Sequence, residues 1–422
     1  MNVLLIGHAC GPNMGSEPGN TWNWALYLSS QHRVWLLAHP QHRSKAEAFL
    51  AKSPNPNLKL VWITVKGLID PWNPEHGEWG IRLHYLIWLS EAYKAAARLC
   101  NEMPFDIAHH LSWATISAPP PLWLLSIPVV WGPVGGGQHA PASFLRYFGR
   151  RTCGEFLRTI RVRSLRSYPR LRKALQISKL TFAVNSDTKH LLTRAGGLSV
   201  ARFLDCGLPP EYVPSELPCP KPPGEFTLLW AGRLEPHKGL TLALRALAKV
   251  QDPSIGLVVA GTGPLRAKSE RLVKRLQLGQ RVKFLGQVPY EMMPALFRSC
   301  DAFFFTSVRD SFGGVVLEAM AHGLPPLTLD HQGVGDFVPP EAGIKVPVTT
   351  PARTIEALAQ GIRQMATGDQ QRHSMRIAAW NFAKAQTWDL RAARMSEIYE
   401  EVVSAEARRV LPVLQLGEVR PL

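Results

Sequence analysis

The sequence predicts an α/β protein built of two doubly wound domains, and three observations lead to this expectation. The 422 residues are too many for one ordinary core and suit two domains of roughly 200 residues. Apolar segments of strand length alternate with helical segments, as in a parallel sheet covered by helices on both faces. A stretch with seven prolines, residues 208–224, separates the two halves, because proline fits neither a helix interior nor a central strand.

The first half opens with a buried strand at residues 3–6, followed by a loop that contains Gly11, Gly15 and Gly19 and then by a helical segment. The glycines either let the backbone approach a ligand closely or form no more than a tight strand-to-helix turn. A long amphipathic helix is expected at residues 81–100. Further strands are expected at 34–37, 58–65, 106–111, 129–131 and 180–184.

The second half begins with a strand at residues 227–231, which leads to Arg233 and Lys238 just before a helix rich in leucine and alanine. Two fixed cations in a loop between strand and helix provide the charge that a departing diphosphate needs. The next strands are expected at residues 255–260, 282–286 and 302–305.

The segment FTSVRDSFGGVVLEAMAHGLPPL, residues 305–327, reads as a strand end, a glycine loop and a helix. At the carboxyl edge of a parallel sheet, the free N–H groups of such a loop and the helix dipole attract an anion. Asp310 and Glu318 lie eight residues apart, one on the loop and one about a turn into the helix. Two acids beside free N–H groups suit a ligand that is part phosphate and part hydroxyl, such as a nucleotide sugar.

The strings GRLEPHKG, residues 232–239, and DSFGGVVLEAMAHGLP, residues 310–325, resemble motifs of the retaining glycosyltransferases of family 4, also called glycosyl transferases group 1. The second string has that family's form acid-x-F-G-x-x-x-x-E-A-M-A-x-G-x-P. Its first acid is usually Glu and is Asp310 here, one methylene shorter. The resemblance implies the GT-B fold, in which two Rossmann-like domains face a central cleft.

The resemblance also implies roles for individual residues. Arg233 and Lys238 would hold the donor diphosphate, Asp310 the sugar, and Glu318 the ribose hydroxyls. On the acceptor side it implies Gly15, whose GSEPG segment matches a variant of the family. His110 stands at the end of an expected strand, and it either contacts the acceptor or has a purely structural place. The donor-binding residues that it implies are Gly232, Arg233, Lys238, Gly313, Gly314, Val315 and Glu318.

We expect five segments along the chain: an acceptor-side Rossmann-like domain at 1–207, a proline-rich linker at 208–224, and a nucleotide-sugar-binding Rossmann-like domain at 225–380. These are followed by a helix at 381–403 and a tail at 404–422. The string TWDLRAARMSEIYEEV resembles the last helix of GT-B enzymes, which crosses back to pack on the first domain.

The formal charge of +16 calls for an anionic partner, and residues 146–173 hold ten Arg or Lys against one acid, Glu155. A basic segment interleaved with apolar residues is typical of an element that lies on an anionic membrane surface. The other interpretation is a solvated helix face. Nucleic acid is not expected as a partner, because no recognition fold or pattern of stacking aromatic residues accompanies the charge.

The six cysteines are scattered without a C-x-x-C pair, which indicates neither a zinc site nor a disulfide framework and favours a reducing cytoplasm. No apolar run reaches 18 residues, so no transmembrane span is expected, and the start reads as a strand rather than a signal peptide. No D-x-D sequence occurs. We therefore expect no metal and no cofactor.

The sequence thus predicts a retaining, metal-independent glycosyltransferase, of the hexosyltransferase kind. Its donor would be a nucleotide-diphosphate sugar of the UDP or GDP type, and its acceptor a glycan or a lipid-linked molecule of cell-surface polysaccharide or glycolipid synthesis. We expect it on the inner face of the plasma membrane as a peripheral protein. The alternatives are another GT-B enzyme, such as a sugar-nucleotide epimerase or a phosphorylase, and a catalytically idle nucleotide-binding module. A dehydrogenase is disfavoured because the first loop lacks G-x-G-x-x-G.

Overall fold

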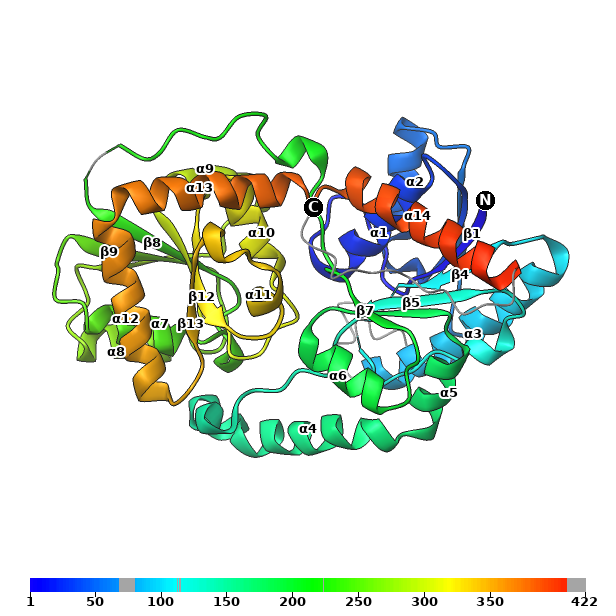
Figure 1. The fold of residues 1–422 in the computed structure, drawn as a ribbon, viewed down its shortest axis with the longest axis horizontal. Coiled ribbons are helices and arrows are strands. Elements are labelled where there is room, and N and C mark those ends of the chain that lie inside the picture. Colours follow the sequence, from blue (N-terminus) through cyan, green and yellow to red (C-terminus); the bar gives the residue numbers. More distant parts are fainter. Residues whose placement is uncertain (68–79, 112, 114, 223, 408–422) are drawn as a thin grey trace. The chain divides into compact units, whose positions relative to one another are not determined.

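The computed structural model describes residues 1–67, 80–111, 113, 115–222 and 224–407 (Figure 1). The described chain divides into two compact units. Unit 1 comprises residues 1–137, 162–207 and the described residues from 388 onward, and unit 2 comprises residues 138–161 and 208–387. Each unit is built around one parallel sheet, which confirms the predicted fold class.

The sheet of unit 1 has the strand order β3-β2-β1-β4-β5-β6-β7, with every pair parallel. Residues Val3–Ile6 of its central strand are completely buried, as expected for a parallel sheet covered on both faces. The strands are β1 (Asn2–Ile6), β2 (Arg33–Ala38), β3 (Leu58–Trp62), β4 (Ile107–His110), β5 (Val129–Val134), β6 (Leu180–Ala183) and β7 (Val200–Arg202). The helices are α1 (Ser16–Leu28), α2 (Arg43–Lys52), α3 (Ile81–Glu102), α5 (Pro169–Ile177), α6 (Ser186–Arg194) and α14 (Trp388–Ala407).

The sheet of unit 2 has the order β10-β9-β8-β11-β12-β13 and is also parallel throughout. The sequence analysis did not identify β7, β12 or β13. The strands are β8 (Phe226–Ala231), β9 (Ile255–Ala260), β10 (Val282–Gly286), β11 (Ala302–Phe305), β12 (Pro326–Asp330) and β13 (Ile344–Pro347). The helices are α7 (Leu240–Ala248), α8 (Arg266–Arg275), α9 (Met293–Arg298), α10 (Gly314–Ala321), α11 (Gln332–Phe337), α12 (Pro351–Thr367) and α13 (Asp369–Lys384).

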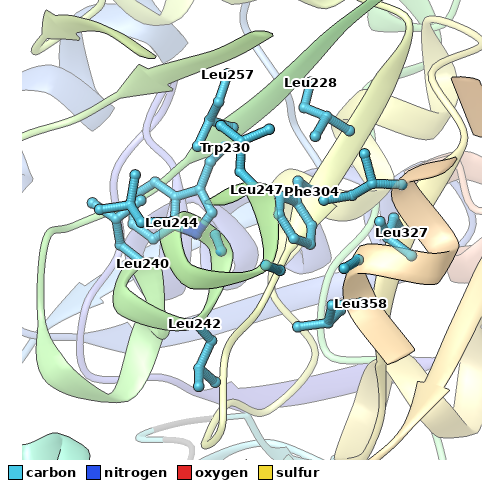
Figure 2. Close-up of a cluster of buried hydrophobic side chains, with 14 of the residues drawn as sticks. Leu228, Trp230, Leu240, Leu242, Leu244, Leu247, Leu257, Phe304, Leu327 and Leu358 are labelled. Atoms are coloured by element: carbon cyan, nitrogen blue, oxygen red, sulfur yellow. The ribbon is translucent and has the colours of Figure 1, made fainter. Parts of the chain in front are cut away.

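The core of unit 2 joins the sheet to the helices on one of its faces. Trp230 and Phe304, from the adjacent strands β8 and β11, point toward leucines of α7 and α12 (Figure 2). These side chains are almost completely removed from water. Because β8 and β11 are fixed by this core, the loops that leave their carboxyl ends start from a rigid base.

Residues 138–161 pack with unit 2, whereas we expected them in an N-terminal domain that runs unbroken from 1 to 207. The physical reason is apolar burial. Phe144 and Phe148, in the 3₁₀ segment Ala142–Arg151, insert into the same core as Trp230. The helix that follows, α4 (Thr152–Ser164), begins in unit 2 and ends in unit 1.

The proline-rich stretch 208–224 is more ordered than an open linker, within the part of it that the structure describes. Trp380 of α13 donates its indole N–H to the carbonyl of Pro214 at 3.1 Å, and Arg376 donates to the carbonyl of Pro218 at 2.6 Å. This stretch therefore lies along α13 as part of unit 2.

Helix α14 packs on α1 within unit 1, and Figure 1 shows the two side by side. Trp388, at its start, meets Trp24 of α1 with ring centroids 5.2 Å apart. Tyr399, near its end, lies beside the buried His109 of β4, its hydroxyl 2.5 Å from the imidazole Nδ1. The expected helix boundaries were 381–403, and α14 instead begins at Trp388, because residues 369–384 form the separate helix α13 of unit 2. Of the predicted tail 404–422, residues 408–422 lie outside the described part of the chain.

Candidate donor site

Two loops of unit 2 meet where its strand order reverses. β8 and β11 are hydrogen-bonded neighbours, yet the chain leaves β8 toward β9 on one side and leaves β11 toward β12 on the other. In open parallel sheets, ligands bind at the carboxyl edge at such a switch point. We call residues 232–239 the β8 loop and residues 306–313 the β11 loop.

The two loops are tied to each other through their backbones. Val308 donates its N–H to the carbonyl of His237 at 2.8 Å, and the hydroxyl of Thr306 donates to the carbonyl of Gly239 at 3.0 Å. Gly239 has a positive φ of 73°, and a Cβ there would overlap the carbonyl of Thr306. The close approach therefore requires glycine at this position.

Lys238 and Asp310 form an ion pair between the two loops. The Lys238 Nζ lies 2.5 Å from the Asp310 Oδ2. The other carboxylate oxygen of Asp310 accepts from the backbone N–H of Ser311 at 3.1 Å. Both side chains keep about a fifth of their surface exposed, 24% for Lys238 and 20% for Asp310, so a ligand can still reach them. The structure thus brings together one predicted cation and one predicted acid.

Arg233 stands at the start of the β8 loop and is the more open of the two predicted cations. Its side chain is 81% exposed, and its guanidinium lies 3.6 Å from the carboxylate of Glu235. Gly232 precedes it with a φ of 154°, a conformation that side chains disfavour. Because most of the Arg233 side chain is exposed, its guanidinium can reach an anion bound at the loop.

Glu318 lies on α10, one turn after the β11 loop, and burial raises the pKa of its carboxyl to about 7. Burial also raises the pKa of the hydroxyls of Tyr212 and Tyr290, with the charge of Glu318 as the second cause in each case. The two tyrosine rings stack with centroids 5.6 Å apart. Glu318 therefore lies near two stacked tyrosines, Tyr212 and Tyr290.

The predicted glycines shape the junction between loop and helix. α10 begins at Gly314, and Gly313 caps it with a φ of 97°. A Cβ at Gly313 would lie 2.7 Å from the ring of Phe305. Val315, also predicted to contact the donor, is half-buried in the first turn.

The two residues predicted on the acceptor side belong to unit 1. Gly15 is the N-cap of α1, and a Cβ there would meet nothing within 4 Å, so the backbone at this position borders open space. His110 ends β4 as expected, but it is buried with 1% exposure and its ring lies 5.8 Å from that of Tyr93. His110 thus lies in the core between the sheet and α3, as in the structural interpretation of this residue.

Several site residues were not predicted from the sequence. Gln332, at the start of α11, accepts from the backbone N–H of Asp310 at 2.7 Å through its amide oxygen. The pKa of His237 is lowered to about 4, mainly by burial and secondly by the charges of Arg309 and Lys238. Its imidazole is therefore neutral at pH 7. His237 is visible in the sequence as part of the β8 loop, whereas Gln332 comes from a distant helix and carries no motif.

No group of three or more His, Cys, Asp or Glu side chains in the described part of the chain is placed to hold a metal ion. None of the helices described is long and apolar enough to cross a bilayer.

Residues 218–382 match the family described as Glycosyl transferases group 1. An uncharacterized glycosyltransferase of Methanocaldococcus jannaschii is 30% identical over 179 residues, covering 42% of this chain and 45% of that protein. A phosphatidyl-myo-inositol mannosyltransferase of Mycobacterium tuberculosis is 32% identical over 191 residues, covering 43% of this chain and 49% of that protein. The match thus spans about half the length of these curated relatives.

Solved structures resemble the whole chain in fold. A sucrose-phosphate synthase from Thermosynechococcus elongatus has a TM-score of 0.64 at 16% identity, covering 96% of this chain and 99% of that one. The Anabaena protein HepE, in complex with UDP and glucose, has a TM-score of 0.60 at 16% identity, covering 95% of this chain and 99% of that one. Both loops of the candidate site lie within residues 218–382, the part of the chain that is similar to the glycosyl transferases group 1. The two parallel sheets share the fold of these solved structures.

Proposed function

We propose that this protein is a retaining glycosyltransferase that moves a sugar from a nucleotide-diphosphate sugar to a glycan or lipid-linked acceptor without a metal ion. The observation that carries the proposal is the Lys238–Asp310 pair, which joins the two loops at the switch point of the sheet. A cation for phosphate and an acid for hydroxyls, side by side, match the two halves of such a donor. The family match and the UDP and glucose bound by the fold relative HepE agree with this donor class.

The residues of the two loops have distinct roles in the proposed reaction. The bond between the anomeric carbon and the diphosphate oxygen breaks, and its electron pair stays on the diphosphate. The acceptor hydroxyl oxygen forms the new bond to that carbon, and its proton is released. Arg233 and Lys238 stabilise the charge that develops on the diphosphate, as preorganised cations do. Asp310 holds the sugar hydroxyls, and Glu318 accepts from the ribose hydroxyls.

The remaining donor contacts come from backbone. The N–H groups of Gly313 and Gly314 start α10 and help to orient sugar and phosphate. Gly232 and Val315 flank the same ligand. Two cations then supply the charge that Mg²⁺ supplies in other transferases.

The acceptor is proposed to be membrane-bound, with the protein on the inner face of the plasma membrane. The basic segment 146–173 supports this, because most of its arginines are exposed. The names of two relatives point the same way: the mycobacterial protein is a phosphatidyl-myo-inositol mannosyltransferase, and one from Saccharomyces cerevisiae is a phosphatidylinositol N-acetylglucosaminyltransferase subunit.

The alternatives are an epimerase of the same fold and an idle nucleotide-binding module. An epimerase would form product without an acceptor. An idle module would bind nucleotide and leave every donor sugar intact. The raised pKa of the buried Glu318 favours an active enzyme over an idle module, because strongly perturbed groups cluster at functional sites.

A thermal-shift screen against UDP, GDP, ADP, dTDP and their sugars, with EDTA present, tests the donor class. One nucleotide should raise the Tm of the purified protein by about 5–10 °C at roughly 100 times its Kd, because it binds only the folded state. The matching sugar nucleotide should then be slowly hydrolysed. A shift that appears only when Mg²⁺ replaces EDTA would refute the metal-free site.

Charge neutralisation in the basic segment tests the membrane surface. Arg163, Arg166 and Arg170 are exposed, and replacing all three by Gln should weaken binding to phosphatidylglycerol-containing vesicles about 100-fold, since each cation contributes about 1 kcal/mol near an anionic leaflet. Co-sedimentation gives the affinity. The matched control neutralises three exposed cations of α8, Lys268, Arg271 and Lys274, and should bind as the wild type does. Equal binding by both variants would remove the membrane role of the segment.

A further inference from the structure

Between residues 152 and 161, helix α4 exposes its large apolar side chains and buries its one acid. Phe156, Leu157 and Ile160 are 53%, 64% and 50% exposed. They occupy positions i, i+1 and i+4, which share one side of a helix. Among residues 152–161, the stretch that belongs to unit 2, the only buried residue is Glu155. The helix is thus held to unit 2 by polar contacts, while its apolar face meets water.

The buried Glu155 connects α4 to the β11 loop. Its carboxylate lies 2.9 Å from the guanidinium of Arg309 and 3.7 Å from that of Arg158. Arg309 immediately precedes Asp310 in the chain. The pKa of Arg158 falls to about 10, first because of burial and then because of the charge of Arg309. The guanidinium groups of Arg309 and Arg158 therefore both lie near the carboxylate of Glu155, and Arg309 belongs to the β11 loop that carries Asp310.

Two further contacts join the same chain segment to the candidate site. Arg151, one residue before α4, forms an ion pair with Glu235 at 2.7 Å, and Glu235 is the partner of Arg233. The carbonyl of His139 accepts from the side-chain amide of Gln332, whose oxygen holds the N–H of Asp310. Residues 138–161 thus brace the β8 loop and the β11 loop from outside.

We propose that α4 is a membrane-responsive positioning element, in which docking of Phe156, Leu157 and Ile160 on an anionic lipid surface fixes the β11 loop through the Glu155–Arg309 pair. The proposal rests on the membrane surface of the proposed function and deepens it. Exposed arginines, Arg161 and Arg163, flank the apolar face, which matches an anionic lipid surface rather than an apolar protein groove. Glu155 is the positioning residue, since it acts on Asp310 only through Arg309.

The effect of lipid binding on the β11 loop follows from the thermodynamic linkage between lipid binding and the order of α4. A surface that binds only the ordered helix stabilises that helix, and the contacts that the ordered helix makes become more populated. Because residues 152–161 contribute no buried apolar side chain to unit 2, polar contacts hold this part of α4 there, among them the Glu155 ion pairs and the hydrogen bond from Arg158 to the carbonyl of Gln138 at 3.0 Å. Lipid binding should therefore stabilise the position of α4. Through the Glu155–Arg309 pair, it should also stabilise the β11 loop.

The test compares the wild-type chain with Glu155→Gln, with and without vesicles of equal parts phosphatidylcholine and phosphatidylglycerol. Hydrogen exchange of the β11 loop amides, residues 306–313, gives the first readout, and hydrolysis of the donor sugar gives the second. In the wild type, vesicles should slow the exchange and speed the hydrolysis, each several-fold. Glu155→Gln should bind the vesicles with unchanged affinity and show neither response. The conservative variant Glu155→Asp should recover part of both.

The possible outcomes distinguish the proposed coupling between α4 and the β11 loop from the proposed glycosyltransferase activity. Full responses in Glu155→Gln would overturn the coupling, and so would a wild type that binds vesicles without slower exchange in the β11 loop. Slower exchange with no hydrolysis of any donor would keep the coupling and refute the transferase. Replacing Phe156, Leu157 and Ile160 by Ser should abolish vesicle binding and both responses. Binding that survives this change would place the lipid contact elsewhere and overturn the proposal.

Discussion

Replacing Lys238 by Ala should lower turnover by about 100- to 1,000-fold while unit 2 remains folded. The expected loss is that of a preorganised charge that acts on a developing negative charge. Lys238 is held in place by Asp310 at 2.5 Å, so its ammonium needs no reorganisation when the diphosphate departs. The Kd of the sugar nucleotide should rise much less than kcat falls, because the additional negative charge on the diphosphate develops as its bond to the sugar breaks.

A second Lys–Asp pair provides a matched control for Lys238→Ala, at the opposite end of β11 from Asp310. Lys221 pairs with Asp301 at 3.0 Å, with side-chain exposures of 20% and 16%, close to those of Lys238 and Asp310. Asp301 precedes β11, whereas Asp310 follows it. Lys221→Ala should therefore cost similar stability in urea unfolding and leave turnover unchanged. If both variants lose turnover equally, the effect of Lys238 is structural and the site assignment fails.

The two strands that carry the loops of the candidate site, β8 and β11, were predictable from their apolar runs. The run Ala302–Phe305 is apolar at every position because β11 lies in the middle of a parallel sheet, and its observed bounds are those predicted. β13, which begins at Ile344 and lies at the sheet edge, carries Lys345 and Pro347 and gives no continuous apolar signal. A strand buried on both faces often gives a continuous apolar run, as β11 does, and an edge strand such as β13 does not. β12 is buried but was missed, since it begins at Pro326 and has the polar Thr328 in its middle.

The path of the chain between the units was not predictable from local patterns. Phe144 and Phe148 look like any apolar residues beside a basic segment, and nothing nearby tells that they fill a core made mainly of residues after 225. The Glu155–Arg309 pair joins residues 154 positions apart. Contacts of this kind depend on tertiary structure alone, and a single sequence contains no periodicity that would reveal them.

The candidate site was accessible to sequence reasoning where it consists of loops that follow strands. Lys238 and Asp310 each leave a central strand, and neighbouring parallel strands bring their carboxyl ends together. His110 also ends a strand, and the same reasoning suggested a ligand contact there. Its burial shows the limit of that reasoning, because position along a strand does not say toward which face the side chain turns.

Replacing Glu318 by Gln should lower kcat/KM for the donor by about 10- to 100-fold, because hydrogen bonds to an ionised group contribute roughly 1.5–3 kcal/mol and the amide is neutral. The raised pKa of about 7 makes the wild type sensitive to pH. Donor hydroxyls bind the ionised carboxylate, so KM should rise as the pH falls below 7 and the group takes up a proton. The Gln variant should lack this rise. Glu341→Gln, an exposed change in the same unit, should retain the wild-type profile.

The same substitution should have the opposite effect on stability at alkaline pH. In the folded protein Glu318 keeps its proton up to about pH 7, whereas in the unfolded chain it loses the proton near its ordinary value of 4.5. The free energy of unfolding of the wild type therefore falls between these values, by about 3 kcal/mol, and does not recover above them. Gln does not titrate. Relative to the wild type, Glu318→Gln should gain that amount between pH 4 and pH 8 in urea unfolding. If Glu318→Gln loses donor binding and yet gains stability as the pH rises, Glu318 binds the ligand at a cost to the stability of the fold. If the stability difference between Gln variant and wild type stays constant with pH, that result contradicts the raised pKa of Glu318.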